Sequence, residues 1–425
     1  MKKNDPAYQA YVDILSRELV PAMGCTEPIA IAYCAAKARS VLGALPERIL
    51  VEASGNMIKN VKSVVVPNTN GQKGVKAAAA IGAFGGDEAA VLEVIAHISN
   101  GVKEKLPEYI DALDFKLLPL ETTEALDFII TVFVKNSYAR VRIAQEHSNI
   151  VLIEKDGEIL FEKALSSVVS TDIPDYTFLN MAGIFDFATS CDLEDVKDIL
   201  ARQIAMNSAI SDEGLRGNYG VNIGKTLLAT YGTDIKTRAR ARAAAGSDAR
   251  MNGCELPVVI NSGSGNQGIT ASLPVIEYAA ALGVADEKLY RALLISNLTT
   301  IHEKCSIGRL SAYCGAVSAG AGAGAGITYL MGGDLNAISH TVVNALAITS
   351  GIVCDGAKSS CAAKIAVAVD AGILGYEMYR SGNQFYDGEG LVVKGVDNSI
   401  RRFGRLGRVG MHETDKEIMR MMTEE

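Results

Sequence analysis

The sequence has no tryptophan, only eight cysteines among its 425 residues, five scattered histidines and no excess of basic charge. Cysteine at this density lies far below that of a secreted disulfide scaffold, which excludes a fold built on disulfides. Lysine and arginine number 41 against 49 acidic residues, for a formal net charge of −8. This balance argues against nucleic acid and against an anionic membrane as partners.

Long apolar runs are also missing. The longest uncharged stretch, residues 315–333, is rich in glycine and alanine, which suits close helix packing better than a lipid-facing span. Residues 1–19 begin with two lysines but continue as a charged amphipathic helix, without the apolar segment and cleavage site of a signal peptide. The sequence therefore predicts a cytoplasmic protein with reduced thiols.

The order of the patterns predicts an α+β fold with two domains. Helical periodicity covers residues 6–45 as two helices, with an interruption at residues 21–24. β-Branched runs follow at residues 49–52 and 64–66, and residues 125–162 hold alternating runs, the last of which contains a Lys155-Asp156-Gly157 hairpin turn. After about residue 170 the chain is rich in alanine, leucine and glycine at helical period. We expect a mostly helical catalytic domain from residues 1–45 and 166–425, with a smaller α/β domain of residues 46–165 inserted in it.

Three cysteines stand in small-residue surroundings. Cys314 precedes the glycine-alanine run, and Cys354 and Cys361 lie seven residues apart in CDGAKSSC. No CxxC pair occurs, which disfavours structural zinc. An inorganic cluster needs small residues and free amides around its sulfurs, whereas a free buried cysteine behaves as a small hydrophobe. Spacing alone leaves both interpretations open.

Cys25 lies in GCTEP, directly before an apolar helix. Thr26 or Glu27 suits the helix cap and Pro28 suits the first turn. The positive end of the helix is expected to lower the pKa of the Cys25 thiol, which makes a nucleophile or a general base. The alternative is a loop cysteine without chemistry.

Two polar loops are candidates for binding a substrate. One, NSGSGNQG, contains Ser262, Ser264 and Asn266 and exposes backbone amides toward a helix that we expect to begin near Ile269, after the strand-like run LPVVI. It matches neither the P-loop nor the dinucleotide pattern. The other is a weaker signal and includes the polar residues Asn56, Lys59, Asn60 and Asn68.

Taken together, the motifs resemble the oxygen-sensitive L-cysteine desulfidases, relatives of the iron-sulfur L-serine dehydratases whose alpha and beta parts are here joined in one chain. The resemblance covers nearly the full length and rests on GCTEP (24–28), SDARM (247–251), NSGSGNQG (261–268), YCGAVSAG (313–320), CDGAKSSC (354–361) and GMHETD (410–415).

The resemblance implies a reaction and a cofactor. Cys314, Cys354 and Cys361 would be the ligands of a [4Fe-4S] cluster with one iron left open as a Lewis acid, and Cys25 the catalytic base. The implied reaction eliminates sulfide from L-cysteine to give pyruvate, ammonia and hydrogen sulfide. The inserted domain resembles the beta part of the serine dehydratases, which would place its polar loop over an amino-acid substrate.

Other functions stay open at this point. The seven-residue spacing of Cys354 and Cys361 matches the desulfidases, but L-serine or L-threonine dehydration is the close alternative. A non-catalytic iron-sulfur sensor and an amino-acid binding protein rank lower. The extent of glycine-alanine packing also leads us to expect a homo-oligomer.

Overall fold

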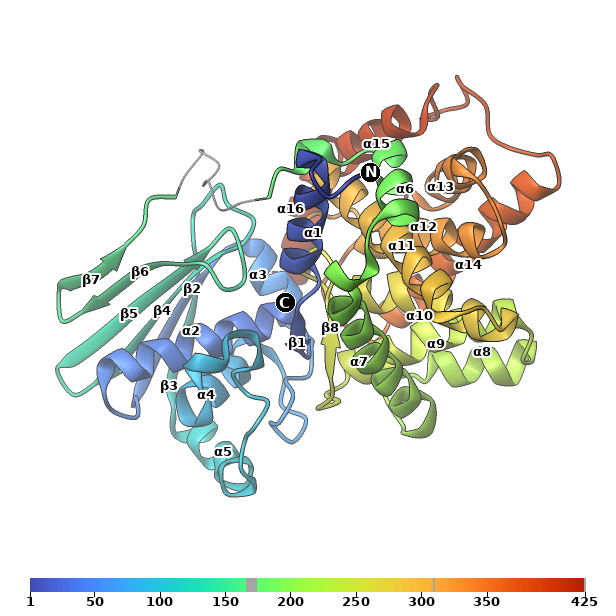
Figure 1. Ribbon diagram of the computed structural model, residues 1–425. Helices are drawn as coiled ribbons and strands as arrows, with labels where there is room; N and C mark the ends of the chain where they lie inside the picture. Colours follow the sequence, from blue (N-terminus) through green and yellow to red (C-terminus); the bar gives the residue numbers. More distant parts are fainter. Residues whose placement is uncertain (166–173, 309, 424–425) are drawn as a thin grey trace.

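The structure, a computed structural model, describes residues 1–165, 174–308 and 310–423. It has a sheet body and a helical body side by side (Figure 1). The predicted α+β class is confirmed, because helices dominate the chain and one mixed sheet stands apart from most of them.

In the described residues, the sheet body contains a six-stranded sheet in the order β3-β2-β4-β5-β6-β7. Its strands are β2 (Arg48–Ala53), β3 (Asp114–Pro119), β4 (Asp127–Val134), β5 (Ser137–Ala144), β6 (Ile150–Lys155) and β7 (Glu158–Glu162). β2 runs parallel to β3, and the other neighbours are antiparallel. Asp156 and Gly157 both have positive φ, as a tight hairpin turn with matching twist requires, so the predicted turn is confirmed.

Helices cover one face of this sheet. They are α2 (Thr26–Leu42), α3 (Gly55–Val61), α4 (Gly74–Gly85), α5 (Asn100–Ala112) and the short 3-10 helix η1 (Glu88–Glu93). α2 is buried on nearly all sides, since it lies between α4 and strands β4 and β5. α4 approaches α2 closely at Gly82, where a Cβ atom would lie 2.1 Å from the Ala32 carbonyl oxygen.

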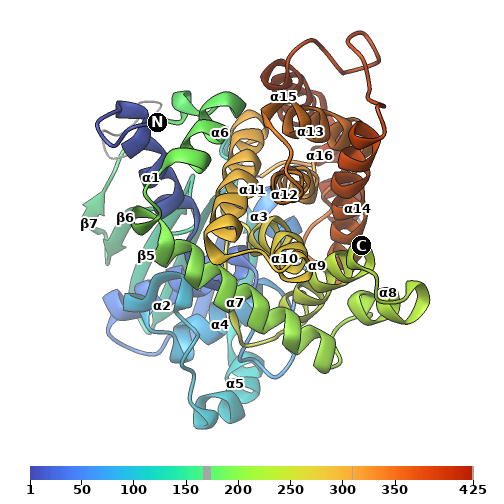
Figure 2. The same ribbon diagram turned by 45° about the vertical axis from the view of Figure 1, so that its right-hand side comes forward.

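The helical body is built around α12. Its helices are α1 (Pro6–Glu18), α6 (Met181–Ser190), α7 (Lys197–Arg216), α8 (Ile223–Tyr231), α9 (Ile235–Met251), α10 (Gly265–Leu282), α11 (Asp286–Ile307), α12 (Gly315–Leu330), α13 (Leu335–Thr349), α14 (Cys361–Arg380), α15 (Val396–Arg405) and α16 (His412–Thr423), with short turns η2 (Tyr176–Phe178), η3 (Leu193–Asp195) and η4 (Leu406–Gly410). Figure 2 shows α12 enclosed by α10, α11, α13 and α14. Glycines permit this packing: a Cβ on Gly320 would lie 2.4 Å from the Ala368 oxygen.

Some predicted elements differ from the structure. A short strand β1 (Pro21–Met23) pairs antiparallel with β8 (Pro257–Val259), where the sequence suggested only an interruption between helices. The β-branched run 64–66 makes only an isolated bridge, Val65 to Lys73, because a turn follows at once. α10 begins at Gly265, four residues earlier than predicted.

The two bodies have separate apolar cores. The core of the sheet body begins at Met23 and includes the buried side chains of α2, whereas α1 belongs to the core of the helical body. The predicted domain boundary after residue 45 stays a prediction, although these cores place α2 with the sheet. The second predicted boundary borders residues 166–173, which lie outside the described residues.

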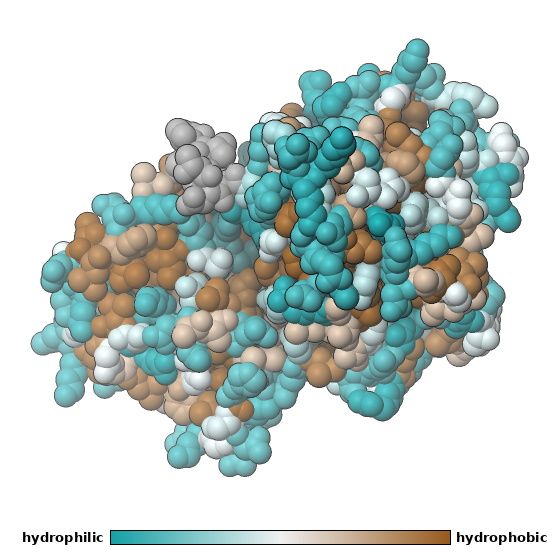
Figure 3. Space-filling model, viewed as in Figure 1, coloured by the Kyte–Doolittle hydropathy of each residue, from teal (hydrophilic) through white to brown (hydrophobic). Residues whose placement is uncertain are grey.

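The surface leaves the oligomeric state open. Exposed apolar side chains lie on the edge strand β7, at Ile159, Leu160 and Phe161, and Figure 3 shows apolar surface over this side of the sheet body. The homo-oligomer stays a prediction. Among the described helices, we find no segment long and apolar enough to span a membrane.

Candidate functional site

A cavity of about 100 Å³ lies where the sheet body meets the helical body. It is lined by residues that are far apart in the sequence, and we call it the cysteine cavity. Its lining includes Cys25, Glu27, Asn60, Arg250, Ser264, Asn266, Gln267, Lys304, Tyr313, Cys314, Cys354, Gly356 and Cys361. The structure thus brings Cys25 together with all three cysteines of the predicted cluster site.

Within the part of the chain that the structure describes, four helices begin at this cavity. Cys25, Ser264 and Cys314 are the N-caps of α2, α10 and α12, and Cys361 is the first residue of α14. Among the described residues, the side chain of Ser264 accepts no hydrogen bond from its own helix. The free amides and the positive helix ends therefore favour thiolates and anionic ligands in the cavity.

Backbone amides also surround the sulfurs of Cys314, Cys354 and Cys361. The N–H groups of Ala316 and Gly356 donate to Cys314 and Cys354 respectively. The hydrogen bond between the two thiols raises the pKa of Cys314, where burial adds to the rise. The same bond, aided by the charge of Lys59, lowers the pKa of Cys354.

These residues fit an iron-sulfur cluster better than a single ion. In the described residues, no group of three or more histidine, cysteine, aspartate or glutamate side chains is spaced to hold one metal ion. A cluster is larger than an ion and is bound by thiolates that accept N–H bonds from small-residue segments. Three cysteines on the wall of one cavity, with amides directed at their sulfurs, match that chemistry.

Cys25 carries a neutral thiol, whereas the sequence predicts a lowered pKa and a thiolate. Its thiol donates a hydrogen bond to Glu27 Oε2 over 3.0 Å. Burial raises the pKa of the Cys25 thiol well above its usual value, and the negative charge of Glu27 adds to this. The predicted lowering by the helix end is therefore wrong: desolvation and a neighbouring carboxylate outweigh the helix dipole.

Glu27 is ionised although it is buried. Burial opposes its charge, but the charge of His147, the Cys25 hydrogen bond and the charge of Arg250 together hold the pKa of Glu27 below its usual range. The amide of Asn60 donates to the second oxygen, Oε1, over 3.0 Å. Cys25 and Glu27 thus form a buried pair with one proton, which rests on sulfur.

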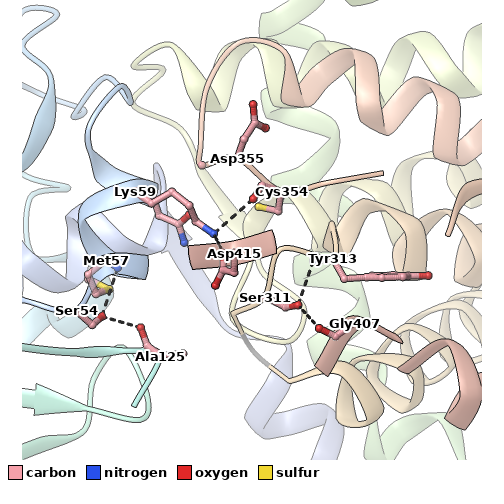
Figure 4. A network of polar contacts seen from close by, with 12 residues as sticks. Ser54, Met57, Lys59, Ala125, Ser311, Tyr313, Cys354, Asp355, Gly407 and Asp415 are labelled. Carbon is pink, nitrogen blue, oxygen red and sulfur yellow. Dashed lines mark hydrogen bonds and ion pairs between the residues drawn. The ribbon is translucent and has the colours of Figure 1, made fainter. Parts of the chain in front are cut away.

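An ion pair joins the two bodies beside the cavity. Lys59 on α3 has a side chain only 1% exposed, and it donates to Asp415 on α16 and to the Cys354 carbonyl oxygen (Figure 4). Ser311, which also lines the cavity, donates to the Gly407 carbonyl oxygen in η4 over 2.8 Å. The Lys59 contacts hold the Cys354 loop and α16 against the sheet body.

The remaining predicted substrate-binding residues divide between cavities. Ser264 and Asn266 line the cysteine cavity. Asn56 lines a larger neighbouring cavity of about 680 Å³, and Ser262 lines a third. Asn68 has positive φ and donates to the Ile95 carbonyl oxygen over 2.6 Å, as a residue that holds a turn.

Sequence reasoning missed Glu27, Arg250 and Asp415 as members of the site. In the sequence, Arg250 stands among alanines with Arg238, Arg240 and Arg242, a pattern typical of a solvated helix face, yet in the structure it is 2% exposed and lines the cavity. The motifs could have identified them, because GCTEP, SDARM and GMHETD contain these three residues.

Known proteins match this chain over most or nearly all of its length. The family model of the serine dehydratase alpha chain matches residues 90–420, which include Cys314, Cys354 and Cys361. A UPF0597 protein of Desulfitobacterium hafniense is 57% identical over 422 residues, covering 99% of this chain and 98% of its own length. UPF0597 proteins of Lachnoclostridium phytofermentans and Treponema denticola are 52% and 44% identical, covering 98% and 99% of this chain and 99% of their own lengths.

Proposed function

The chain belongs to the serine dehydratase alpha-chain family, and on that basis we propose that it is a lyase that eliminates sulfide from L-cysteine. The products are hydrogen sulfide and aminoacrylate, which takes up water to give pyruvate and ammonia. The observation that carries the proposal is that Cys25 lines the same cavity as Cys314, Cys354 and Cys361.

Cys314, Cys354 and Cys361 are proposed to hold a [4Fe-4S] cluster. When bound, an iron without a cysteine ligand supplies a Lewis acid for the leaving group. The chain supplies the electrostatics: the starts of α12 and α14 and the nearby Lys59 favour the charge of three thiolates.

Cys25 and Glu27 are proposed to move the proton. Sγ of Cys25 takes the proton from Cα of the substrate, while Glu27 Oε2 receives the proton that Sγ carried. The pair carries one negative charge before the transfer and none after it, because it gains the Cα proton. The buried site therefore never holds a second negative charge on these two residues, which would be costly. Asn60 holds Glu27 in place through Oε1.

The test is an anaerobic preparation, analysed for iron and acid-labile sulfide and then assayed for sulfide and pyruvate release from L-cysteine and L-serine. We expect about four irons per chain and rapid sulfide release. Iron without turnover of any amino acid would point to a sensor. Absence of iron after attempted reconstitution would overturn the cluster proposal and leave an amino-acid binding protein.

L-serine dehydration is the second candidate. It is favoured by the match to the serine dehydratase alpha chain. The proton transfer from Cα is the same in both reactions, and only the leaving group differs. A pocket without dedicated contacts to that group discriminates weakly. Pyruvate from L-serine or 2-oxobutyrate from L-threonine, with little sulfide from L-cysteine, would select the dehydratase.

Replacing Glu27 with glutamine is expected to lower kcat by about 100-fold at neutral pH. The thiol of Cys25 then lacks its proton acceptor, and burial still keeps its pKa above the usual value. Activity of E27Q should therefore rise as the pH increases from about 7 to 9.5, whereas the native enzyme stays nearly flat.

The matched control is E88Q. The pKa of Glu88 is also lowered despite burial, through hydrogen bonds that include one from Ser40, but it lies on the sheet body outside the cysteine cavity. It should keep the native rate and pH profile. An E27Q enzyme with native kcat and a native profile would show that Cys25 does not use Glu27.

A further inference from the structure

Arg250 brings unused hydrogen-bond donors to the cysteine cavity. It lies in the last turn of α9 and is 2% exposed. Nη1 donates to Asn266 Oδ1 over 3.1 Å, but Nε and Nη2 have no partner among the described residues. A buried guanidinium with two unsatisfied N–H groups is costly, so this arrangement points to an anionic ligand.

The surroundings of Arg250 favour a carboxylate. Gly265 makes room for the guanidinium, since a Cβ at Gly265 would lie 2.2 Å from Nε. Gly265 is also the first residue of α10, whose N-cap Ser264 makes no side-chain cap bond. A planar guanidinium beside free helix amides matches the two oxygens of a carboxylate.

Unused acceptors face the same cavity. Asn60 is 6% exposed, and because its Nδ2 donates to Glu27, its Oδ1 is left without a partner in the described residues. Gln267 is 4% exposed, and its Oε1 likewise has no described partner. Two acceptors of this kind match an ammonium group, which has three donors and no acceptor.

We infer that the cavity binds a zwitterionic α-amino acid, with its carboxylate on Arg250 and its ammonium group on the side-chain oxygens of Asn60 and Gln267. The rest of the lining, Cys25 and the three cysteines, then faces Cα and the leaving group. The inference deepens the proposed function and rests on it for the reaction, but binding can be measured without turnover.

The experiment uses calorimetry on the full chain with L-alanine, which is a zwitterion without a leaving group. L-alaninamide lacks the carboxylate and L-lactate lacks the ammonium group. We expect L-alanine to bind and both analogues to bind at least about tenfold more weakly. Equal affinity for L-alanine and L-alaninamide, or no binding of L-alanine, would overturn the inference.

Variants assign the two ends of the ligand. R250M should weaken L-alanine binding at least about tenfold. R250K should bind more tightly than R250M, because lysine keeps the positive charge but lacks the paired N–H donors of a guanidinium. Q267L should weaken L-alanine but not L-lactate. The control is R242M, since Arg242 lies on the same helix and pairs with Asp212 and Glu277 away from the cavity.

The outcomes separate this inference from the proposed function. Native binding of L-alanine by folded R250M, or an unchanged KM in that variant, would overturn the carboxylate site while leaving the elimination intact. Binding that depends on Arg250, in a protein that releases neither sulfide nor pyruvate, would support the amino-acid site and remove the lyase. If R250M does not fold, R250K and the analogue series decide the question.

Discussion

Replacing Cys25 with alanine is expected to lower kcat for elimination by about 10²- to 10⁴-fold and to leave the iron content unchanged. Cys25 Sγ is the atom proposed to take the Cα proton, and the neighbouring Glu27 is held by Asn60 in a position to accept the proton of the thiol. Cys25 is the N-cap of α2, whereas the proposed cluster ligands belong to other segments of the chain. Loss of the base therefore need not disturb the metal.

The measurement compares pyruvate release with iron and acid-labile sulfide in the same anaerobic sample. C34A is the matched control, because Cys34 lies on the same helix, is fully buried in the core of the sheet body and does not line the cavity. It should lose some thermal stability through a small cavity but keep kcat. Near-native turnover by C25A would contradict the assignment of Cys25 as base.

Replacing Cys354 with alanine is expected to abolish both the cluster and the elimination. Cys354 accepts hydrogen bonds from the Cys314 thiol and the Gly356 amide and lines the cysteine cavity with Cys314 and Cys361. With two thiolates left, a cluster of this kind lacks one of its attachment points. Iron per chain should fall below about one, and pyruvate release should fall to background.

The control for this variant is C305A. Cys305 is exposed and lies on α11 outside the cysteine cavity. We expect C354A to keep its fold, because Lys59 donates to the backbone carbonyl oxygen of residue 354, which the substitution preserves. Circular dichroism checks this. Full iron content in a folded C354A would contradict the ligand assignment.

Local patterns predicted those parts of the fold that local forces determine. The Asp156-Gly157 turn and the alternating strands around it were predicted because turn geometry and burial on one face leave a short-range signal. β1 was not, since three residues carry no period and its pairing partner lies more than 200 residues later. Strand β3 was missed for a related reason: it has six residues and none of them is buried, so its hydrophobic signal is weak.

The site residues also fall into those that the sequence predicted and those that only the structure revealed. Cys25 and the cluster cysteines were singled out by motif, and the structure places them around one cavity. Arg250 was missed because, in the sequence, it resembles Arg238 and Arg242 on the same helix, and only tertiary packing buries it. The charge state of Cys25 was mispredicted because the sequence shows the helix start but not how deeply the thiol is buried.

The contact between α3 and α16 has a consequence for biosynthesis. Lys59 on α3 finds its partner Asp415 only when almost the whole chain has left the ribosome. At about 5–20 residues per second, Cys25 waits roughly 10 to 45 s for Arg250, which lines the same cavity, and Lys59 waits still longer for Asp415. During this interval the thiol lacks its finished surroundings and is open to oxidation. We therefore expect the proposed cluster to be inserted after translation.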